Sequence, residues 1–238
     1  MQFLKTNRIF TRLILVCSAF LLNASLAAQE PAVETLPGAA EKLIATLSSI
    51  NSFDAKFSQT VENEYGQVLD ETSGRFLVQR PNQFRWQTET QTIVADGRSL
   101  WTYDSDLEQL TIQTQQTTLA NSPVTLLSGD AHRLGDEYLI TLLGTHADTD
   151  LYELQPKAES AVFEKVQLLI RADKIIELLF RDALGQKTVI RFSAHQINQP
   201  IAPEQFSFSA PDGADIVDSR DKPVAADSSE KQPEASNE

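Results

Sequence analysis

Apolar and polar residues alternate along most of the chain, and this pattern predicts short β-strands. Phe53, Ala55 and Phe57 fall on one face of the segment 53–61, and polar residues fall on the other. A period of two is that of a half-buried strand. The same alternation recurs in the segments 72–80, 84–88, 92–95, 99–103, 107–112, 138–142, 151–154, 162–170, 175–181, 187–194 and 206–208. About eleven short strands with short connections are typical of an antiparallel meander.

Helical periodicity is confined to two places. Apolar residues fall at intervals of three and four over residues 36–50, and Pro37 suits a first helical turn. A shorter helix is expected around residues 123–127. Asp96-Gly97 between apolar runs predicts a tight hairpin. Because repeated βαβ units would need more helices, the pattern predicts an α+β fold with one large curved antiparallel sheet and helices on its concave face.

The two ends of the chain differ from this domain. Lys5, Arg8 and Arg12 precede an apolar run over residues 13–22 and then small residues, the order of a cleaved secretory signal. We expect cleavage after Ala27, with Ala28 as the alternative. An uncleaved membrane anchor is disfavoured, because about ten apolar residues are too few to cross roughly 30 Å of hydrocarbon. The predicted domain spans residues 28–217, and the polar, acidic residues 218–238 are predicted to be a disordered tail.

Charge and cysteine content restrict the mature chain further. Cys17 is the only cysteine and lies in the leader, so we expect no disulfide and no lipid anchor. Three of the 20 basic residues also lie there, which leaves 17 bases against 33 acids, a net charge of −16. Such a charge disfavours nucleic acid and anionic membranes as partners. Acidity that serves solubility alone is the simpler explanation. The domain is expected to be a periplasmic monomer.

No pattern of catalytic residues is present. His132, His146 and His195 lack metal-binding spacing, and neither a nucleophile elbow nor a phosphate-binding glycine loop occurs. We therefore expect no enzyme activity, no cofactor, no metal ion and no use of ATP by this chain.

The most informative residue is Arg80. It shares a parity with Phe76 and Val78, so its guanidinium projects from an apolar face at the point where Pro81 ends the strand. One interpretation is a strand-end arginine that points to water. The other is that Arg80 crosses the mouth of an apolar concavity and donates to backbone carbonyls of a covering helix. The five donors of guanidinium suit a clasp that can form and break.

Several motifs, in order along the mature domain, resemble those of the periplasmic outer-membrane lipoprotein carrier proteins of the LolA type. The resemblance is carried by Ser52-Phe53-x-Ala55-x-Phe57-x-Gln59, Arg80-Pro81-Asn82-x-Phe84-x-Trp86, Val94-x-Asp96-Gly97-x-x-Leu100-Trp101-x-Tyr103, Glu108-Gln109, Asn121-x-Pro123, Pro156-Lys157 and Phe206-x-Phe208. It implies an incomplete β-barrel whose hydrophobic cavity, lidded by helices, holds the acyl chains of a lipoprotein in transit. It also implies an inner-membrane ATP-binding-cassette release complex as the donor and an outer-membrane lipoprotein acceptor.

The resemblance also implies roles for single residues. Arg80 corresponds to an arginine that holds the lid, with acceptors in the two helices near Leu47 and Leu127. Phe84 matches a rim position tied to cargo transfer, and Trp86 and Ile93 match cavity-lining positions. Ordinary core packing would have the same periodicity as a cavity wall, so that alternative stays open for the last three residues.

Two other classes of function compete with a lipid-chain carrier. A periplasmic sensor could use the same half-barrel to detect lipid or mislocalised lipoprotein, although such sensors usually have a second domain for which this chain has no room. A periplasmic enzyme would need an acid pair or a histidine site, and neither can be assembled from this sequence.

Overall fold

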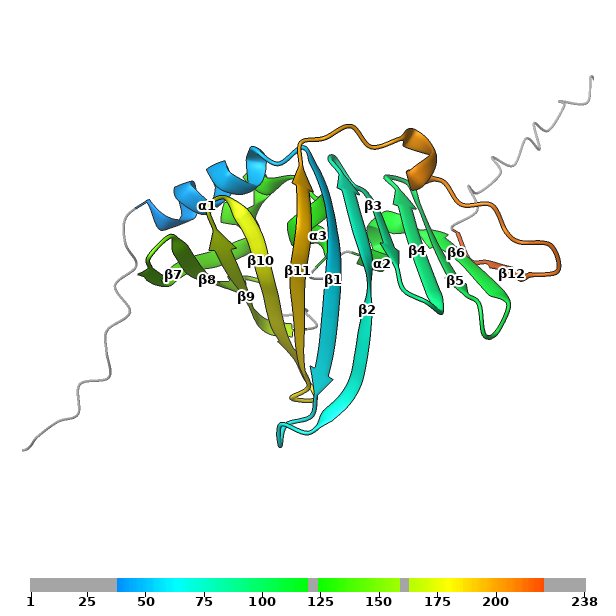
Figure 1. The fold of residues 1–238 in the computed structure, drawn as a ribbon, viewed down its shortest axis with the longest axis horizontal. Helices are drawn as coiled ribbons and strands as arrows, with labels where there is room; N and C mark the ends of the chain where they lie inside the picture. Colours follow the sequence, from blue (N-terminus) through cyan, green and yellow to red (C-terminus); the bar gives the residue numbers. More distant parts are fainter. Residues whose placement is uncertain (1–37, 120–123, 159–162, 221–238) are drawn as a thin grey trace, which may run out of the picture. The chain divides into compact units, whose positions relative to one another are not determined.

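A computed structural model describes residues 38–119, 124–158 and 163–220, and the strands in this part form one sheet (Figure 1). The sheet has 12 strands. Their bounds are β1 Ser52–Glu62, β2 Val68–Gln79, β3 Gln83–Gln87, β4 Gln91–Asp96, β5 Ser99–Asp104, β6 Gln109–Thr114, β7 Tyr138–His146, β8 Thr149–Pro156, β9 Phe163–Arg171, β10 Lys174–Asp182, β11 Lys187–Ile197 and β12 Asp215–Asp218. The predicted α+β class and the predicted large sheet are confirmed.

The sheet is antiparallel and does not close. Its order is β12-β6-β5-β4-β3-β2-β1-β11-β10-β9-β8-β7, and every neighbouring pair is antiparallel except β12 with β6. Most chain neighbours pair through short turns, while β11 returns to pair with β1 and β12 returns to pair with β6. Because β12 and β7 are the two ends of the order and do not pair with each other, the result is an incomplete barrel, as expected.

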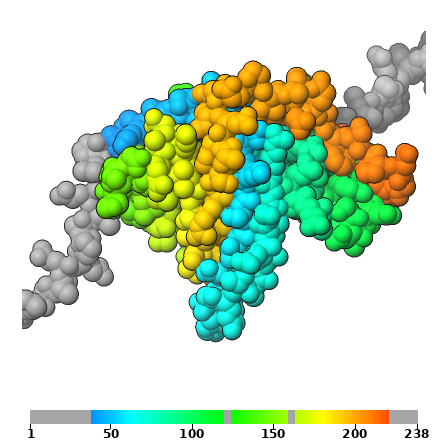
Figure 2. All heavy atoms as spheres, in the orientation of Figure 1, coloured from blue at the N-terminus to red at the C-terminus, as the bar shows by residue number. Residues whose placement is uncertain are grey.

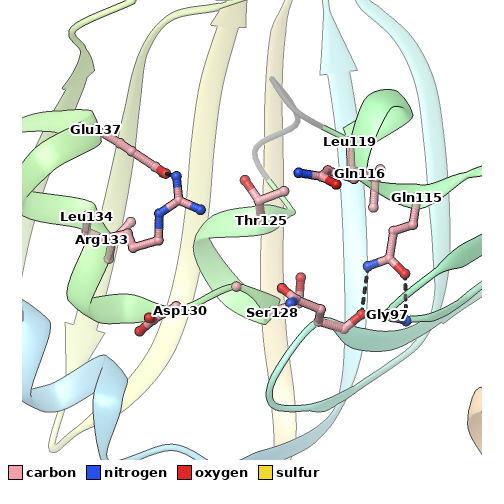
Figure 3. A pocket seen from close by; sticks show the side chains of 12 residues that line it. Gly97, Gln115, Gln116, Leu119, Thr125, Ser128, Asp130, Arg133, Leu134 and Glu137 are labelled. Atoms are coloured by element: carbon pink, nitrogen blue, oxygen red, sulfur yellow. Dashed lines mark hydrogen bonds and ion pairs between the residues drawn. The ribbon is translucent and has the colours of Figure 1, made fainter.

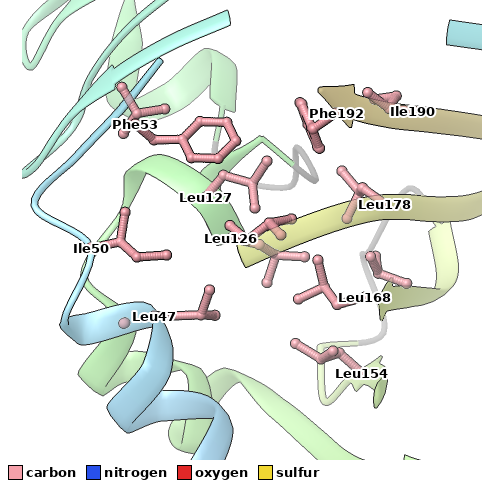
Figure 4. Packing of buried hydrophobic residues seen from close by; sticks show 14 of the residues in the cluster. Leu47, Ile50, Phe53, Leu126, Leu127, Leu154, Leu168, Leu178, Ile190 and Phe192 are labelled. Carbon is pink, nitrogen blue, oxygen red and sulfur yellow. The ribbon is translucent and has the colours of Figure 1, made fainter. Parts of the chain in front are cut away.

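Short helices cover one face of this sheet. They are α1 Ala39–Ser48, α2 Gln115–Leu119, α3 Thr125–Ser128, η1 Ala131–Arg133 and α4 Leu134–Glu137. The buried side of α1 carries Leu43 and Leu47, both 0% exposed, and Figure 4 shows Leu47 facing the same apolar interior as Leu126 and Leu127 of α3. Helical spacing gives one apolar stripe, and burying that stripe against the sheet is what stabilises a helix of this length.

The sequence predictions fail at two places near the end of the domain. Residues 206–208 are not a strand, because Pro203 begins a 3-10 helix, Pro203–Phe206, whose Phe206 is buried. The strand β12 was not predicted, since its four residues are all exposed and therefore carry no burial pattern. The predicted leader lies outside the described residues, as does the predicted tail beyond residue 220.

The hairpin of β1 and β2 is longer than its neighbour β3. β3 pairs with β2 only from Arg75 to Gln79, so residues 68–74 continue past it. Figure 2 shows this end of the hairpin, in cyan, projecting from the sheet.

Candidate functional site

A largely apolar cavity of about 310 Å³ lies between the sheet and the segments α2 and α3. Its walls come from five neighbouring strands of the first half, from β10 and β11, and from the two helical segments. The lining residues are Gln59, Phe76, Phe84, Trp86, Gln91, Ile93, Leu100, Thr102, Leu119, Val124, Leu127, Leu178, Phe180, Ile190 and Phe192. Residues of like parity on adjacent strands share a face, which explains why they converge.

Aromatic rings build one wall of the cavity. The ring of Trp86 stacks on Phe57 with centroids 3.7 Å apart and meets the edge of Phe76 at 5.4 Å. Trp86 is also the cross-strand partner of Ile93. Among the described lining residues, only Gln59 and Gln91 have an amide side chain, so this part of the interior offers mainly hydrocarbon and π-surface to a ligand.

Four of the five apolar residues proposed from the sequence line this cavity: Phe84, Trp86, Ile93 and Leu127. Leu47 is not among the described residues that line it and belongs to the continuous core beneath α1. Phe84 is only 2% exposed and lies within the wall rather than on an exposed rim, since it faces inward between Val78 and Ala95 of the adjacent strands.

Arg80 connects the end of β2 to the covering segments. Its Nη1 donates to the carbonyl oxygen of Gly129, the residue that ends α3, at 2.8 Å. Nε and Nη2 are buried and have no hydrogen-bond partner among the described residues. Burial lowers the pKa of the guanidinium, and the nearby Asp130 carboxylate opposes this shift. The group stays charged at neutral pH, because arginine starts from a pKa above 12.

The expected second acceptor in the first helix is not observed. The carbonyl of Leu47 instead accepts from the backbone N–H of Ile50, at 3.2 Å, in the turn that ends α1. Arg80 therefore fastens α3 and not α1 in this part of the chain.

Comparison with known proteins decides the family. The family model described as outer membrane lipoprotein carrier protein LolA matches residues 48–209. The outer-membrane lipoprotein carrier protein of Hahella chejuensis is 35% identical over 207 residues, which cover 85% of this chain and 96% of that protein. The protein of the same name from Azotobacter vinelandii is 32% identical over 213 residues, covering 88% and 99%. This chain belongs to the LolA family.

A solved structure of a LolA superfamily protein from Nitrosomonas europaea also superposes on this LolA-family chain. The TM-score is 0.43 at 15% identity, with 71% of this chain and 98% of that one covered. The family assignment rests on the sequence matches alone.

A buried glutamine that the sequence analysis missed links three loops of this LolA-family chain. Gln115 is 6% exposed; its Nε2 donates to the carbonyl of Asn82 at 2.7 Å, and its Oε1 accepts from the N–H of Gly97 at 2.7 Å. Asn82 in turn donates its backbone N–H to the carbonyl of Ser128 at 2.9 Å. Figure 3 shows both bonds of Gln115 as dashed lines. No sequence motif marks such a role, because both partners of Gln115 are backbone atoms.

A second, polar pocket of about 500 Å³ lies on the other side of these contacts (Figure 3). Arg133 and Glu137 form an ion pair of 2.8 Å in its wall, and Gly129 contributes backbone. Leu119 of α2 lines both this pocket and the apolar cavity. The smaller, apolar cavity matches the chemistry of an acyl chain, and the larger pocket does not.

The covering helix α1 of the LolA-family fold is held by a separate set of bonds. Lys42 of α1 donates to Asp150 of β8 at 2.6 Å, and Thr145 donates to the same carboxylate at 2.6 Å. The bond from Lys42 is the main cause that lowers the pKa of Asp150. Burial, together with this carboxylate, raises the pKa of the neighbouring Tyr152 to about 12.

Neither a cluster of metal-ligating side chains nor a long apolar helix occurs among the described residues. No group of three or more His, Cys, Asp or Glu in that part of the chain could hold a metal ion. None of its helices combines the length and apolar character needed to cross a membrane.

Proposed function

We propose that this protein is a periplasmic carrier that takes lipoproteins released from the inner membrane, shelters their acyl chains and delivers them to an acceptor at the outer membrane. One observation supports this most directly. A LolA-family chain encloses an aromatic, hydrocarbon-lined cavity under short helices that only a few hydrogen bonds fasten.

The free energy of moving acyl chains out of water is too large for this protein to bind them from water and release them again. At about 0.8 kcal/mol per buried CH₂, three acyl chains of about fifteen methylenes each represent on the order of 36 kcal/mol. Noncovalent affinities saturate near about −20 kcal/mol. The chains must therefore pass from one apolar environment to another while water is kept out.

The cavity must enlarge to accept such cargo. An apolar cavity of about 150 Å³ holds one benzene ring, and this cavity of about 310 Å³ is about twice that size. Three acyl chains do not fit until the helical segments move. Among the described residues, two direct hydrogen bonds join α3 and its end to the β2–β3 turn, one from Arg80 to Gly129 and one from Asn82 to Ser128. At about 2 kcal/mol for the bond from the charged Arg80 and about 0.5–1.5 kcal/mol for the backbone bond, they can open without unfolding the sheet.

Arg80 suits the role of the clasp for a second reason. In the closed state it makes one hydrogen bond while two further donors are buried without a described partner. Each idle buried donor costs about 1–3 kcal/mol, and hydration of the side chain on opening removes that cost. The two buried donors therefore reduce the free energy by which Arg80 favours the closed state, which suits a carrier that must load and unload.

Energy for loading has to come from another protein. The sequence contains no nucleotide-binding loop, so an ATP-driven release complex in the inner membrane is the proposed donor, and an outer-membrane lipoprotein acceptor is the proposed recipient. The predicted secretory leader supports a site of action in the periplasm.

The deciding experiment is depletion of the protein in its own cells, followed by separation of the two membranes and location of a lipidated outer-membrane protein. We expect lipoproteins to accumulate at the inner membrane. An unchanged distribution would refute the carrier and favour the periplasmic lipid sensor. As a control, the depleted cells are supplied with either wild type or the cavity-filling variant Ile93→Trp. Rescue by wild type alone would show that the phenotype depends on the cavity.

A further inference from the structure

The projecting end of the β1–β2 hairpin carries an exposed apolar surface. Its members are Tyr65 (80% exposed), Val68 (54%), Leu69 (55%) and, from the turn between β10 and β11, Leu184 (78%). The two turns lie side by side, because Lys187 pairs with Glu62 at 3.1 Å. We call these four residues the hairpin end. Apolar side chains gathered in this way on a monomer mark an interaction site.

The hairpin end adjoins an unpaired strand edge. β2 pairs with β1 along its whole length, but on its other side β3 begins pairing only at Arg75. At residues 68–73 no described strand therefore lies on that side. Such an edge offers backbone donors and acceptors to an added strand.

The strand edge itself carries charge of one sign. Glu64, Asp70 and Glu71 take part in none of the ion pairs found among the described residues, while the nearby Glu62 is neutralised by Lys187. No basic residue lies between positions 62 and 74. The edge is therefore acidic as well as apolar.

The concave face leads from the cavity to this end. Gln59 lines the cavity and faces Thr72 across the hairpin, and Val61, two residues further on the same face, faces Asp70. A partner bound at the hairpin end would accordingly sit on the continuation of the sheet face that carries the cavity residue Gln59.

We propose that the hairpin end and the edge of β2 at residues 68–73 dock a partner protein through an extended segment of alternating apolar and basic side chains, added as a strand to the sheet. Because Asp70 and Glu71 lie on opposite faces of β2, the lysines or arginines of that segment would meet Asp70 on the face of Val61, and its apolar side chains would lie on the other face, with Val68.

Charge selects this occupant over two others. Anionic lipid surfaces repel an edge with three unpaired acids. A second copy of the chain would bring the same acids together, and the register shift of β2 near Val68 further hinders pairing between copies, as irregularities at natural sheet edges do. The surface is outside the cavity, so its test needs no lipoprotein and is independent of the proposed function.

The test uses the full mature chain and two labelled synthetic peptides, one of alternating lysine and valine and one of alternating glutamate and valine. Fluorescence anisotropy measures binding at low and high salt, and amide hydrogen exchange locates it. We expect the lysine peptide to bind, salt to weaken it, and exchange to slow at residues 68–73. The double variant Asp70→Lys/Glu71→Lys should weaken that peptide about tenfold and prefer the glutamate peptide.

Matched variants separate local from general effects. Glu204→Lys/Asp212→Lys changes the net charge equally at exposed sites outside the edge and should leave binding unchanged. Leu184→Ser should weaken binding, whereas Leu107→Ser, at a residue that is 71% exposed elsewhere, should not.

Four results would overturn the proposal. The first is that the lysine peptide does not bind, and the second is that both charge-reversal pairs weaken its binding equally. The third is that phosphatidylglycerol vesicles, and not the peptide, slow amide exchange at residues 68–73. The fourth is that the chain forms a concentration-dependent dimer that Leu184→Ser abolishes.

Discussion

Replacing Arg80 by leucine should make the closed state of this protein more stable and its cavity slower to open. The substitution removes the hydrogen bond from Nη1 to the carbonyl of Gly129 and also removes the two buried donors, Nε and Nη2, that lack a described partner. The guanidinium is largely buried, which lowers its pKa, so an apolar leucine side chain suits this site.

The two contributions have opposite signs and can be compared. A hydrogen bond from a charged donor contributes about 2 kcal/mol, and two unsatisfied buried donors cost about 2 kcal/mol each. Gly129 lines the polar pocket, so we expect water to replace the lost donor at its carbonyl. The closed state should gain on the order of 2 kcal/mol, which lowers the open population about thirtyfold.

Stopped-flow entry of a dansylated fatty acid measures opening directly, and urea unfolding measures stability. We expect Arg80→Leu to unfold at equal or higher urea and to take up the fatty acid about thirtyfold more slowly. Arg85→Leu is the matched control. Arg85 donates from Nε to Gln87 at 3.1 Å and from Nη1 to Gln205 at 3.4 Å, and it is not among the cavity-lining residues. Its loss should slightly lower stability and leave uptake unchanged.

Uptake by Arg80→Leu as fast as by wild type, or faster, would refute the expected net cost of Arg80 in the closed state. If Arg80→Leu lowered the free energy of unfolding by more than about 2 kcal/mol, the two buried donors of Arg80 would not be destabilising. The guanidinium would then make more hydrogen bonds than the structure shows.

Three further substitutions test other parts of the structure. Phe84→Glu buries a carboxylate in the cavity wall, so it should abolish fatty-acid binding and cost about 3 kcal/mol or more, while Phe84→Leu should retain binding. Asp150→Asn removes a carboxylate whose pKa is lowered mainly by the bond from Lys42. That carboxylate stabilises the fold above its unfolded pKa near about 4 and loses this effect as pH falls through its lower folded pKa, so the variant should show a flatter loss of stability in acid. Gly74→Ala should cost about 2 kcal/mol in urea unfolding, because a Cβ there overlaps the carbonyl of Gln87, whereas Gly144→Ala, with open space around it, should be tolerated. Unchanged fatty-acid binding by Phe84→Glu would contradict the first expectation. An unchanged pH profile of Asp150→Asn would contradict the second, and unchanged stability of Gly74→Ala the third.

Alternation predicted the sheet because burial on one face imposes a period of two wherever a strand covers a core. Phe53, Ala55 and Phe57 are all buried in the structure. The same logic fails for β12, whose Ile216 and Val217 are 53% and 40% exposed and whose stability comes from backbone pairing with β6. It also fails at Phe206, where burial belongs to a 3-10 turn that Pro203 begins.

The candidate site was predictable only where side chains form it. Trp86 and Ile93 face inward by parity, so a pattern can find them. Leu47 has the same helical signature as a lid residue yet lies in closed core, because periodicity reports burial and not the presence of empty space. The acceptors of Arg80 and Gln115 are backbone carbonyls, which carry no residue identity and therefore leave no trace in the sequence.

The unclosed order of the sheet, with β12 at one end and β7 at the other, has a mechanical consequence. In a closed barrel, strand number and shear set the radius, so widening it means breaking ladder hydrogen bonds. An open sheet is free of that constraint, and its two wings can spread by a change of twist and curvature while every strand keeps its partners. The volume offered to hydrocarbon is then an elastic property of the sheet, and one carrier can accommodate acyl chains that differ in length and number.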